Sequence, residues 1–364
     1  MIEARANPEA PRALAHAEEL FAAGDVRGAI DALTVANRAA RDARLERALV
    51  RVRRDGCRLL APSRGRATPV ATTPDGPGDG RVVEVDRASM TVGALRTGLD
   101  RSGCLLVRGL VPTGNVEELT AGIDAALEAH DVADAGGEVD PGWYHAFTMP
   151  DRVTTADVGD AVDTDHSESL QPNHIPERLR RKFIRSTGGL WTAYSPHMLF
   201  ELFEVVDEVG IGSLMTEFFG ERPFLSANKC TLRRVPPDAG LGGWHQDGAF
   251  LGDYVGAFNL WVALTRCGRD APGMDLVPRR FDHVLKSDDA ADFDWSLSDQ
   301  AVRRAAGDTP IVRPEFEAGD ALLFDHLLVH RTAATPDMKR ERHAIEAWFF
   351  APSAYPKGQL PLVY

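Results

Sequence analysis

The feature that most constrains the fold is a run of short apolar segments that begins near residue 222 and continues almost to the end of the chain. Gly and Pro separate the segments, as turns separate the strands of a sheet protein. One helical stretch, SLSDQAVRRAAG at 296–307, interrupts the run. The run therefore predicts an all-β sandwich or barrel. Its segments are FLSANKCTLRRV, GAFNLWVALTRC, GMDLVPRR, GDALLFDHLLVH and RHAIEAWFFAP.

The region before this run is mixed. GCLLVRGLV at 103–111 predicts a buried strand, because the apolar run is nearly continuous and stops at Pro112. Residues 113–130 and 197–219 have the three- and four-residue apolar spacing of helices. Residues 131–190 have no periodicity. A long aperiodic stretch in an ordered protein is typical of a lid or binding loop, and disorder is the alternative that composition leaves open.

Residues 8–58 predict helices, with one break at Gly24-Asp25. The stretch AEELFAAGDVRGAIDALTVANR is similar to a single tetratricopeptide-type hairpin. One such hairpin cannot bury its apolar face alone. We expect it either to pack on the main domain as a cap or form a homodimer contact, or to provide a docking surface for another protein.

Residues 61–81 are rich in Pro, Gly, Ser and Thr and predict a linker. The expected organisation is thus an N-terminal helical extension at 1–60, a linker at 61–81 and one domain at 82–364. Within that domain we expect a lid region around 131–190.

Composition excludes several classes of protein. The net charge is −13, and residues 1–70 carry 13 Lys and Arg against 9 Asp and Glu, so the excess acid lies in the main domain. Such a surface is unsuited to nucleic acid, which needs clustered basic residues. No apolar run is long enough to cross a membrane, and the N-terminus lacks an apolar signal core. The four cysteines lie far apart and form no CxxC pair, so we expect a cytoplasmic protein. The acidic main domain disfavours a large polyanion such as CoA, and we therefore expect a small-molecule substrate.

The segment GGWHQDGAF carries the pattern that suggests chemistry. If the segment is extended, His245 and Asp247 are two residues apart and point to the same side. His330 follows 83 residues after Asp247, where a later strand could return to the same end of a barrel. Two histidines and one carboxylate on one face of an ion are typical of non-haem iron(II) oxygenases, because they leave coordination positions open for a co-substrate and dioxygen.

Arginines follow at the next expected strand. Arg340 and Arg342 lie 10 and 12 residues after His330, where a guanidinium could bind a carboxylate through two hydrogen bonds. A zinc pair formed by His326 and His330 on a helix is less consistent with the sequence, because the flanking residues predict strand and no HExxH is present. His166 has acidic neighbours, but the sequence around it does not predict a strand, which favours a polar lid.

These motifs together resemble one family. The combination of WHQDG, W-x-A-L at 261–264, GDALLFD…H and R-x-A-I at 342–345 is similar to the phytanoyl-CoA dioxygenase family. The resemblance covers roughly residues 85–355 and is specific at 241–350. That family belongs to the iron(II)- and 2-oxoglutarate-dependent oxygenases. The resemblance therefore implies a mainly β fold with flanking helices and a double-stranded β-helix (jelly-roll or cupin-like) core, to which this chain adds the N-terminal hairpin.

The resemblance also implies a role for particular residues. The HxD pair and the late histidine would bind Fe(II) and be the catalytic residues, and the arginine that opens R-x-A-I would bind the distal carboxylate of 2-oxoglutarate. A small hydroxyl residue would share that carboxylate, and the Trp of W-x-A-L would line the co-substrate pocket. In this sequence the metal ligands are His245, Asp247 and His330, and the 2-oxoglutarate residues are Arg342, Thr332 and Trp261.

Two further comparisons with the family matter. The family usually has Pro-Gly-Ser-His after W-x-A-L, whereas this chain has Arg279 and Arg280 in place of Ser-His. These arginines could bind an anionic substrate or be solvated, and we favour the second. Some relatives are halogenases with a small residue in place of the metal carboxylate. Asp247 is retained here, which favours hydroxylation, with desaturation, ring closure or epoxidation as chemically adjacent outcomes.

We therefore expect a dioxygenase that uses O2, is helped by ascorbate in vitro and releases succinate and CO2. Its reaction would be hydroxylation of an unactivated C–H bond in a small molecule of specialised-metabolite biosynthesis, with an acyl-CoA as the alternative substrate. A non-catalytic β-helix protein used for binding or as a scaffold is the alternative from another class. Substrate choice would come from the lid region and from Trp143, Tyr144, Trp191, Phe250 and Tyr254.

Overall fold

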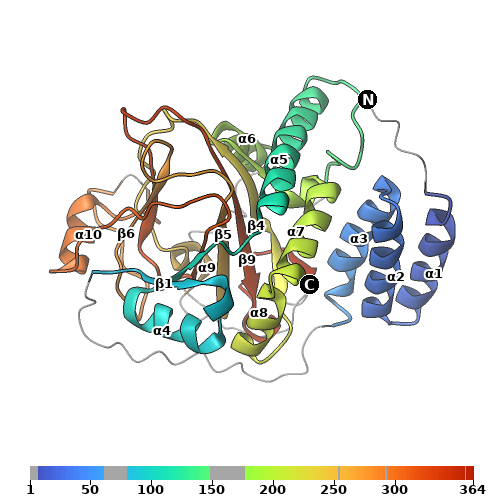
Figure 1. The fold of residues 1–364 in the computed structure, drawn as a ribbon, viewed down its shortest axis with the longest axis horizontal. Coiled ribbons are helices and arrows are strands. Elements are labelled where there is room, and N and C mark those ends of the chain that lie inside the picture. The colour runs from blue at the N-terminus through green and yellow to red at the C-terminus, as the bar shows by residue number, and fades with distance from the viewer. Residues whose placement is uncertain (1–6, 61–79, 148–176, 253–254, 292, 357) are drawn as a thin grey trace.

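The computed structural model describes residues 7–60, 80–147, 177–252, 255–291, 293–356 and 358–364. In these residues a sheet-rich core is flanked by helices (Figure 1). Most of the predicted linker (61–79) and part of the predicted lid (148–176, with His166) lie outside the described residues. None of the helices described is long and apolar enough to cross a membrane.

The main sheet has the strand order β1-β2-β7-β5-β9-β4-β10, with β3 beside β4. Neighbouring strands are antiparallel except for β1 and β2. Its strands are β1 (Val83–Asp86), β2 (Cys104–Arg108), β3 (Gly189–Trp191), β4 (Phe224–Val235), β5 (Ala257–Ala263), β7 (Ala321–Phe324), β9 (Arg342–Phe350) and β10 (Pro361–Val363). A second sheet pairs β6 (Gly273–Leu276) with β8 (His330–Ala333), also antiparallel.

Helices flank this core at both ends and along one face (Figure 1). The α-helices are α1 (Ala10–Ala22), α2 (Val26–Ala39), α3 (Ala43–Gly56), α4 (Val92–Ser102), α5 (Thr113–Asp134), α6 (Glu177–Ser186), α7 (Pro196–Glu208), α8 (Ile211–Phe219), α9 (Gly248–Leu251) and α10 (Asp299–Ala306). Short 3-10 turns occur at η1 (Arg87–Ser89), η4 (Thr192–Tyr194) and η5 (Pro352–Ala354).

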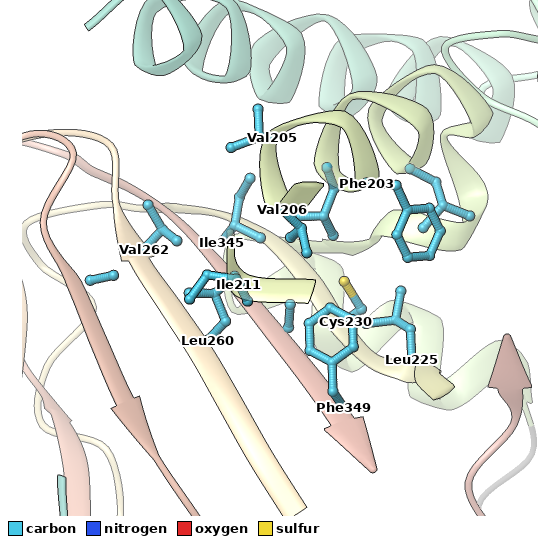
Figure 2. Close-up of a cluster of buried hydrophobic side chains, with 14 of the residues drawn as sticks. Phe203, Val205, Val206, Ile211, Leu225, Cys230, Leu260, Val262, Ile345 and Phe349 are labelled. Atoms are coloured by element: carbon cyan, nitrogen blue, oxygen red, sulfur yellow. The ribbon is translucent and has the colours of Figure 1, made fainter. Parts of the chain in front are cut away.

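The central strands are buried on both faces, which explains why their sequences are continuously apolar rather than alternating. On the outer face, α7 and α8 cover β5, β9 and β4 (Figure 2). Val206 and Ile211 lie there with Leu260, Ile345 and Phe349. The other face of the same strands carries larger rings and the polar residues of the site described below.

The N-terminal region has three helices where the sequence predicted a pair. A second break falls at 40–42, because Ala40 is extended and the Asp42 carboxylate accepts a hydrogen bond from the Arg44 amide at the start of α3. The Ala- and Arg-rich sequence hides this break, since its helical spacing continues through it. Helix α3 packs against α7 and β10.

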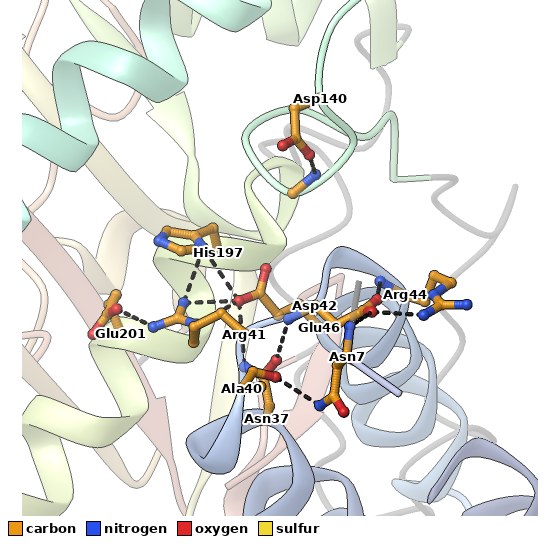
Figure 3. Close-up of polar contacts among 11 residues, drawn as sticks. Asn7, Asn37, Ala40, Arg41, Asp42, Arg44, Glu46, Asp140, His197 and Glu201 are labelled. Atoms are coloured by element: carbon orange, nitrogen blue, oxygen red, sulfur yellow. Dashed lines mark hydrogen bonds and ion pairs between the residues drawn. The ribbon is translucent and has the colours of Figure 1, made fainter. Parts of the chain in front are cut away.

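A polar network joins α3 to α7 (Figure 3). Glu46 is 1% exposed and accepts hydrogen bonds from Arg41 at 2.8 Å. Arg41 also pairs with Glu201 and lies 2.9 Å from Nδ1 of His197, both on α7. Burial acts to raise the pKa of Glu46, but His197 and Arg41 outweigh it and lower that pKa. The N-terminal helices thus pack on the sheet-bearing part of the chain, while the division into 1–60, 61–81 and 82–364 stays a prediction.

The segment GDALLFDHLLVH was predicted as one strand, and this prediction is wrong. It forms β7 in the main sheet and β8 in the second sheet, with a turn over 325–329 between them. The Asp325 carboxylate accepts a hydrogen bond from the Leu327 amide and stabilises that turn. Because the chain leaves the main sheet here, His330 lies on the second sheet.

Asp320 connects β2 to β7, and its removal should destabilise the fold. Its buried carboxylate accepts hydrogen bonds from Arg108 at 2.7 Å, the Gly109 amide at 2.8 Å and the Glu317 amide at 2.9 Å. We expect Asp320→Ala to lower the free energy of unfolding by about 2–4 kcal/mol, since three donors lose their acceptor. Urea denaturation measures this change.

Glu84→Ala is the matched control. Glu84 binds the same Arg108 at 2.9 Å, but its side chain is 46% exposed. An exposed ion pair contributes below about 1 kcal/mol, so this variant should denature close to the wild type. Equal losses in the two variants would contradict the role given to Asp320.

Candidate metal centre

The structure brings three potential metal ligands together from distant parts of the chain. One ligand atom each of His245, Asp247 and His330 lie within 4.8 Å of one another. His245 and His330 face each other across an antiparallel bridge, in which each amide donates to the other's carbonyl at 3.0 Å. Their imidazole centroids are 4.4 Å apart. No other group of three His, Cys, Asp or Glu within metal-binding distance occurs in the described residues.

The sequence interpretation assumed that the HxD segment is extended, but only part of it is. His245 is in the β-bridge, but Asp247 has helical φ and ψ of −63° and −22° and precedes the short helix α9. The carboxylate is therefore aimed by a strand-to-helix turn and not by strand alternation. Gly248 allows this turn, because a Cβ there would lie 2.4 Å from Val284 and 3.1 Å from the His326 carbonyl oxygen.

Gln246 points away from its two neighbours and holds the turn. It is buried, and its Nε2 donates to the Leu327 carbonyl at 2.7 Å and to the His283 carbonyl at 3.2 Å. Its Oε1 accepts from the Leu285 amide at 2.7 Å. Two backbone segments, one at 283–285 and one at Leu327, are thereby fixed around the two ligands of the HxD motif, which is the kind of supporting layer that metal ligands need.

Both imidazoles are held with Nε2 free for a metal. Nδ1 of His245 lies 2.9 Å from the Gly243 carbonyl oxygen, and Nδ1 of His330 lies 3.1 Å from that of Leu328. A carbonyl oxygen only accepts hydrogen bonds, so each Nδ1 carries the proton. Nε2 of His330 is 3.6 Å from Oδ2 of Asp247. The Nε2 lone pairs of His245 and His330 and Oδ2 of Asp247 consequently face a common space.

The electrostatics of the site favour ligation at neutral pH. Burial and the neighbouring His330 lower the pKa of His245 to about 4, which keeps its imidazole neutral. Burial acts to raise the pKa of Asp247, but the Lys229 ammonium outweighs it and holds that pKa well below its usual range. A neutral imidazole and an ionised carboxylate are the forms that bind metal.

Lys229 is a site residue that the sequence analysis missed. Its Nζ donates to Oδ1 of Asp247 at 2.5 Å. It also lies 4.5 Å from the ring centroid of Phe250 and 5.6 Å from that of Trp348. The available signal was a single lysine inside the apolar segment FLSANKCTL, at a position where a buried strand has few reasons to carry a charge.

The residues predicted to bind a co-substrate carboxylate lie near the start of β6. Arg342 is 4% exposed, and its Nη1 donates to the Gly273 carbonyl at 3.0 Å. Among the described residues its Nε has no hydrogen-bond partner and no carboxylate lies within ion-pair distance. Its guanidinium is 5.5 Å from the ring centroid of Trp261, and Thr332 pairs with Met274, next to Gly273. Burial lowers the pKa of Arg342 to about 10.

The arginines that replace the family's Ser-His bind groups of the protein itself and are not freely solvated. Arg280 donates to Asp325 at 2.6 Å, and the two side chains are 8% and 11% exposed. Nη1 of Arg279 donates to the carbonyls of Ala305 and Ala306 at the end of α10. Both therefore stabilise turns near β8.

The aromatic residues proposed for substrate contact divide into two groups. Phe250 lies near the cluster, with its ring centroid 6.0 Å from that of His245. Trp143, Tyr144 and Trp191 pack instead with the hydrophobic core that includes α5 and α7, and their contact with a substrate stays a prediction. They were predicted to contact substrate because the sequence shows which residues are aromatic but not on which face of the sheet they pack. Tyr254 lies outside the described residues.

A ring that the sequence analysis did not select lies beside the metal ligands. The Trp295 ring is 5.7 Å from that of His245 and 5.8 Å from that of Phe250. It is half-buried, and the exposed Phe293 stacks on it at 5.0 Å. These rings border the more accessible of the two histidines.

The sequence of the chain matches one known protein family. Residues 99–341 match the family described as Phytanoyl-CoA dioxygenase (PhyH). The match covers more than half of the chain and includes all three cluster residues, and it ends one residue before Arg342. No curated protein matches the chain.

Similar solved structures share the backbone only in part. EctD from S. alaskensis, solved with 2-oxoglutarate and 5-hydroxyectoine, is 15% identical, with a TM-score of 0.49 over 81% of this chain and 85% of that chain. AviO1 from Streptomyces viridochromogenes Tue57 is 17% identical, with a TM-score of 0.43 over 74% and 99%. SnoK, a non-heme alpha ketoglutarate dependent carbocyclase from nogalamycin biosynthesis, is 16% identical, with a TM-score of 0.45 over 80% and 100%.

The cluster should bind one divalent cation per chain. We expect Mn(II) or Co(II) titrated under anaerobic conditions to bind with 1:1 stoichiometry by isothermal titration calorimetry. His330→Ala should weaken binding more than about 100-fold, because it removes a ligand, whereas loss of an outer supporting contact typically costs 10- to 100-fold. His283→Ala is the control, since His283 forms an exposed pair with Asp282 outside the cluster. Unchanged binding in His330→Ala would exclude this site.

Proposed function

We propose that the chain, which belongs to the phytanoyl-CoA dioxygenase family, is a non-haem iron(II)- and 2-oxoglutarate-dependent dioxygenase. The reaction we favour is hydroxylation of an unactivated C–H bond in a small molecule, with release of succinate and CO2. The observation that carries the proposal is the cluster of His245, Asp247 and His330, with two Nε2 atoms and one carboxylate oxygen facing the same space.

The residues present fit the metal and its co-substrate. Two imidazoles and one carboxylate suit iron(II) and leave positions open. Arg342 supplies the second requirement, because a buried guanidinium whose Nε has no partner in the described part of the chain is suited to a carboxylate ligand. Thr332 and Trp261 lie beside the same region and complete the proposed 2-oxoglutarate pocket.

Iron(II) and 2-oxoglutarate, when bound, supply the activation of dioxygen that a hydroxylation needs, and the protein supplies binding and orientation. His245, Asp247 and His330 would hold the metal ion. Arg342 would bind the far carboxylate of the co-substrate. Phe250 and Trp295 border His245 and exclude water from the space where a substrate C–H bond would lie.

Other parts of the proposal concern fold and location. We propose that the two sheets form a double-stranded β-helix, which is supported by the cluster lying between β8 of one sheet and the β4 lysine of the other. Four free cysteines support a cytoplasmic location.

A scaffold without catalytic activity is the second candidate. It would share the fold and the helical extension. It has no use for a buried arginine whose Nε lacks a partner, because such a group destabilises a protein that binds no anion. The unpaired Nε of Arg342 in the described structure therefore favours the enzyme.

Uncoupled turnover tests the activity without knowledge of the substrate. With iron(II), ascorbate and O2, we expect the purified protein to convert 2-oxoglutarate slowly to succinate, measured by chromatography. Asp247→Ala should abolish this conversion, because it removes the carboxylate ligand. Full conversion by Asp247→Ala would overturn the assignment.

The role of Arg342 predicts a selective loss of co-substrate affinity. We expect Arg342→Ala to weaken 2-oxoglutarate binding by about 2–5 kcal/mol, or roughly 30-fold or more, because it removes one partner of a buried charge pair. Mn(II) binding should change little. Arg340→Ala is the matched control, since Arg340 precedes the same strand but is 71% exposed and pairs with Asp270. A similar effect of both variants would contradict a specific contact at Arg342.

A further inference from the structure

Lys229 is the one lysine among the described residues whose ammonium contacts the metal-binding cluster. Its Nζ binds Oδ1 of Asp247 at 2.5 Å, whereas Oδ2 of the same carboxylate lies 3.6 Å from Nε2 of His330. The two oxygens of Asp247 thus face different partners. One faces the histidines, and the other faces a cation fixed to the main sheet.

The irregularity of β4 places Lys229 at this point. Pairing of β4 with β9 shifts register between Leu225 and Cys230. Such a bulge changes the direction of side chains. Residues 358–360 cover the bulge, because Asn228 accepts from the Leu360 amide at 2.9 Å and the Ala227 amide donates to the Leu360 carbonyl at 2.8 Å. Cys230 then packs in the outer core, and Lys229 faces the cluster.

Aromatic rings restrict the ammonium further. Phe250 and Trp348 lie 4.5 Å and 5.6 Å from Nζ and attract it through their ring faces. The side chain is only 19% exposed, so water competes weakly for the ammonium. Asp247 is 2% exposed and gains little from solvent either. The hydrogen bond between them is consequently strong and directed.

We propose that Lys229 is a positioning residue, which holds Oδ1 of Asp247 so that the carboxylate offers only Oδ2 to a metal ion. This inference rests on the function proposed above. A carboxylate free to rotate can bind a metal through both oxygens and so occupy two coordination positions. A co-substrate that chelates through two atoms, together with dioxygen, needs three positions beyond the triad. Holding one oxygen therefore preserves a position for the co-substrate.

The test uses Co(II) as the metal, because its visible absorption responds to coordination number and it can be studied without turnover. The intact protein is compared with Lys229→Met and Lys229→Arg, first with Co(II) alone and then with 2-oxoglutarate. Lys339→Met is the matched control, since Lys339 is exposed and its ammonium contacts the Pro336 carbonyl.

We expect Lys229→Met to bind Co(II) at least as tightly as the wild type, because a positive charge near the site is removed. Its Co(II) spectrum should change before 2-oxoglutarate is added, and its affinity for 2-oxoglutarate should fall about tenfold or more. Lys229→Arg should restore both properties, and Lys339→Met should retain them. If Lys229→Met does not fold, Lys229→Leu replaces it with the same expected outcomes, since it also lacks a donor.

Two results would overturn the proposal. An unchanged Co(II) spectrum with unchanged 2-oxoglutarate affinity means that Lys229 does not control the carboxylate. An unchanged Co(II) spectrum with weaker 2-oxoglutarate binding means that Lys229 contacts the co-substrate instead. Failure of the proposed function is distinguishable from both, because the wild type would then bind no Co(II) or would bind it equally well after His330→Ala.

Discussion

The pair of backbone hydrogen bonds between His245 and His330 is the interaction on which the rest of the site depends. Each amide donates to the other's carbonyl at 3.0 Å, which fixes the separation and direction of the two side chains at once. The chain must leave the main sheet after β7 to make this bridge, and must turn sharply after His245 to bring in Asp247. The turn at 325–329, the Gln246 hydrogen bonds and the glycine at 248 serve these two requirements.

The two buried charges at the site, Asp247 and Arg342, differ in how they are compensated. Asp247 is compensated by Lys229, whereas the hydrogen bonds of the Arg342 guanidinium in the described residues go to backbone carbonyls, and the Trp261 ring lies beside it. An incompletely compensated buried charge costs stability unless a ligand of opposite charge arrives. This difference is the physical reason to assign a co-substrate carboxylate to Arg342, while Lys229 already has an acidic partner inside the protein.

Much of the fold was predictable because apolar runs and turn residues are local signals. Strands β2, β4, β5, β6 and β9 lie within predicted segments, as do helices α8 and α10. Helix α5 ends four residues beyond the predicted 113–130, and the predicted stretch 197–219 forms two helices, α7 and α8. The errors arose where a local interaction breaks a continuous pattern. Asp42 starts a third N-terminal helix inside a uniform helical sequence, and Asp325 divides one apolar segment between two sheets. Arg279 and Arg280, thought to be solvated, bind carbonyls and a carboxylate that lie far along the chain.

The sequence by itself determined which side chains could form the site, because His245, Asp247, His330 and Arg342 are recognisable from residue type and spacing in a β-rich region. Only the tertiary structure decided how they act together. Asp247 lies on a helical turn, and a backbone carbonyl fixes the proton of each imidazole on Nδ1. Trp191 packs in the hydrophobic core on the helix-covered side of the sheet. The tertiary structure also brought in Lys229 across 18 residues of sequence. The reason is physical: chemical type is encoded residue by residue, whereas direction and charge environment depend on contacts between strands that are distant in the chain.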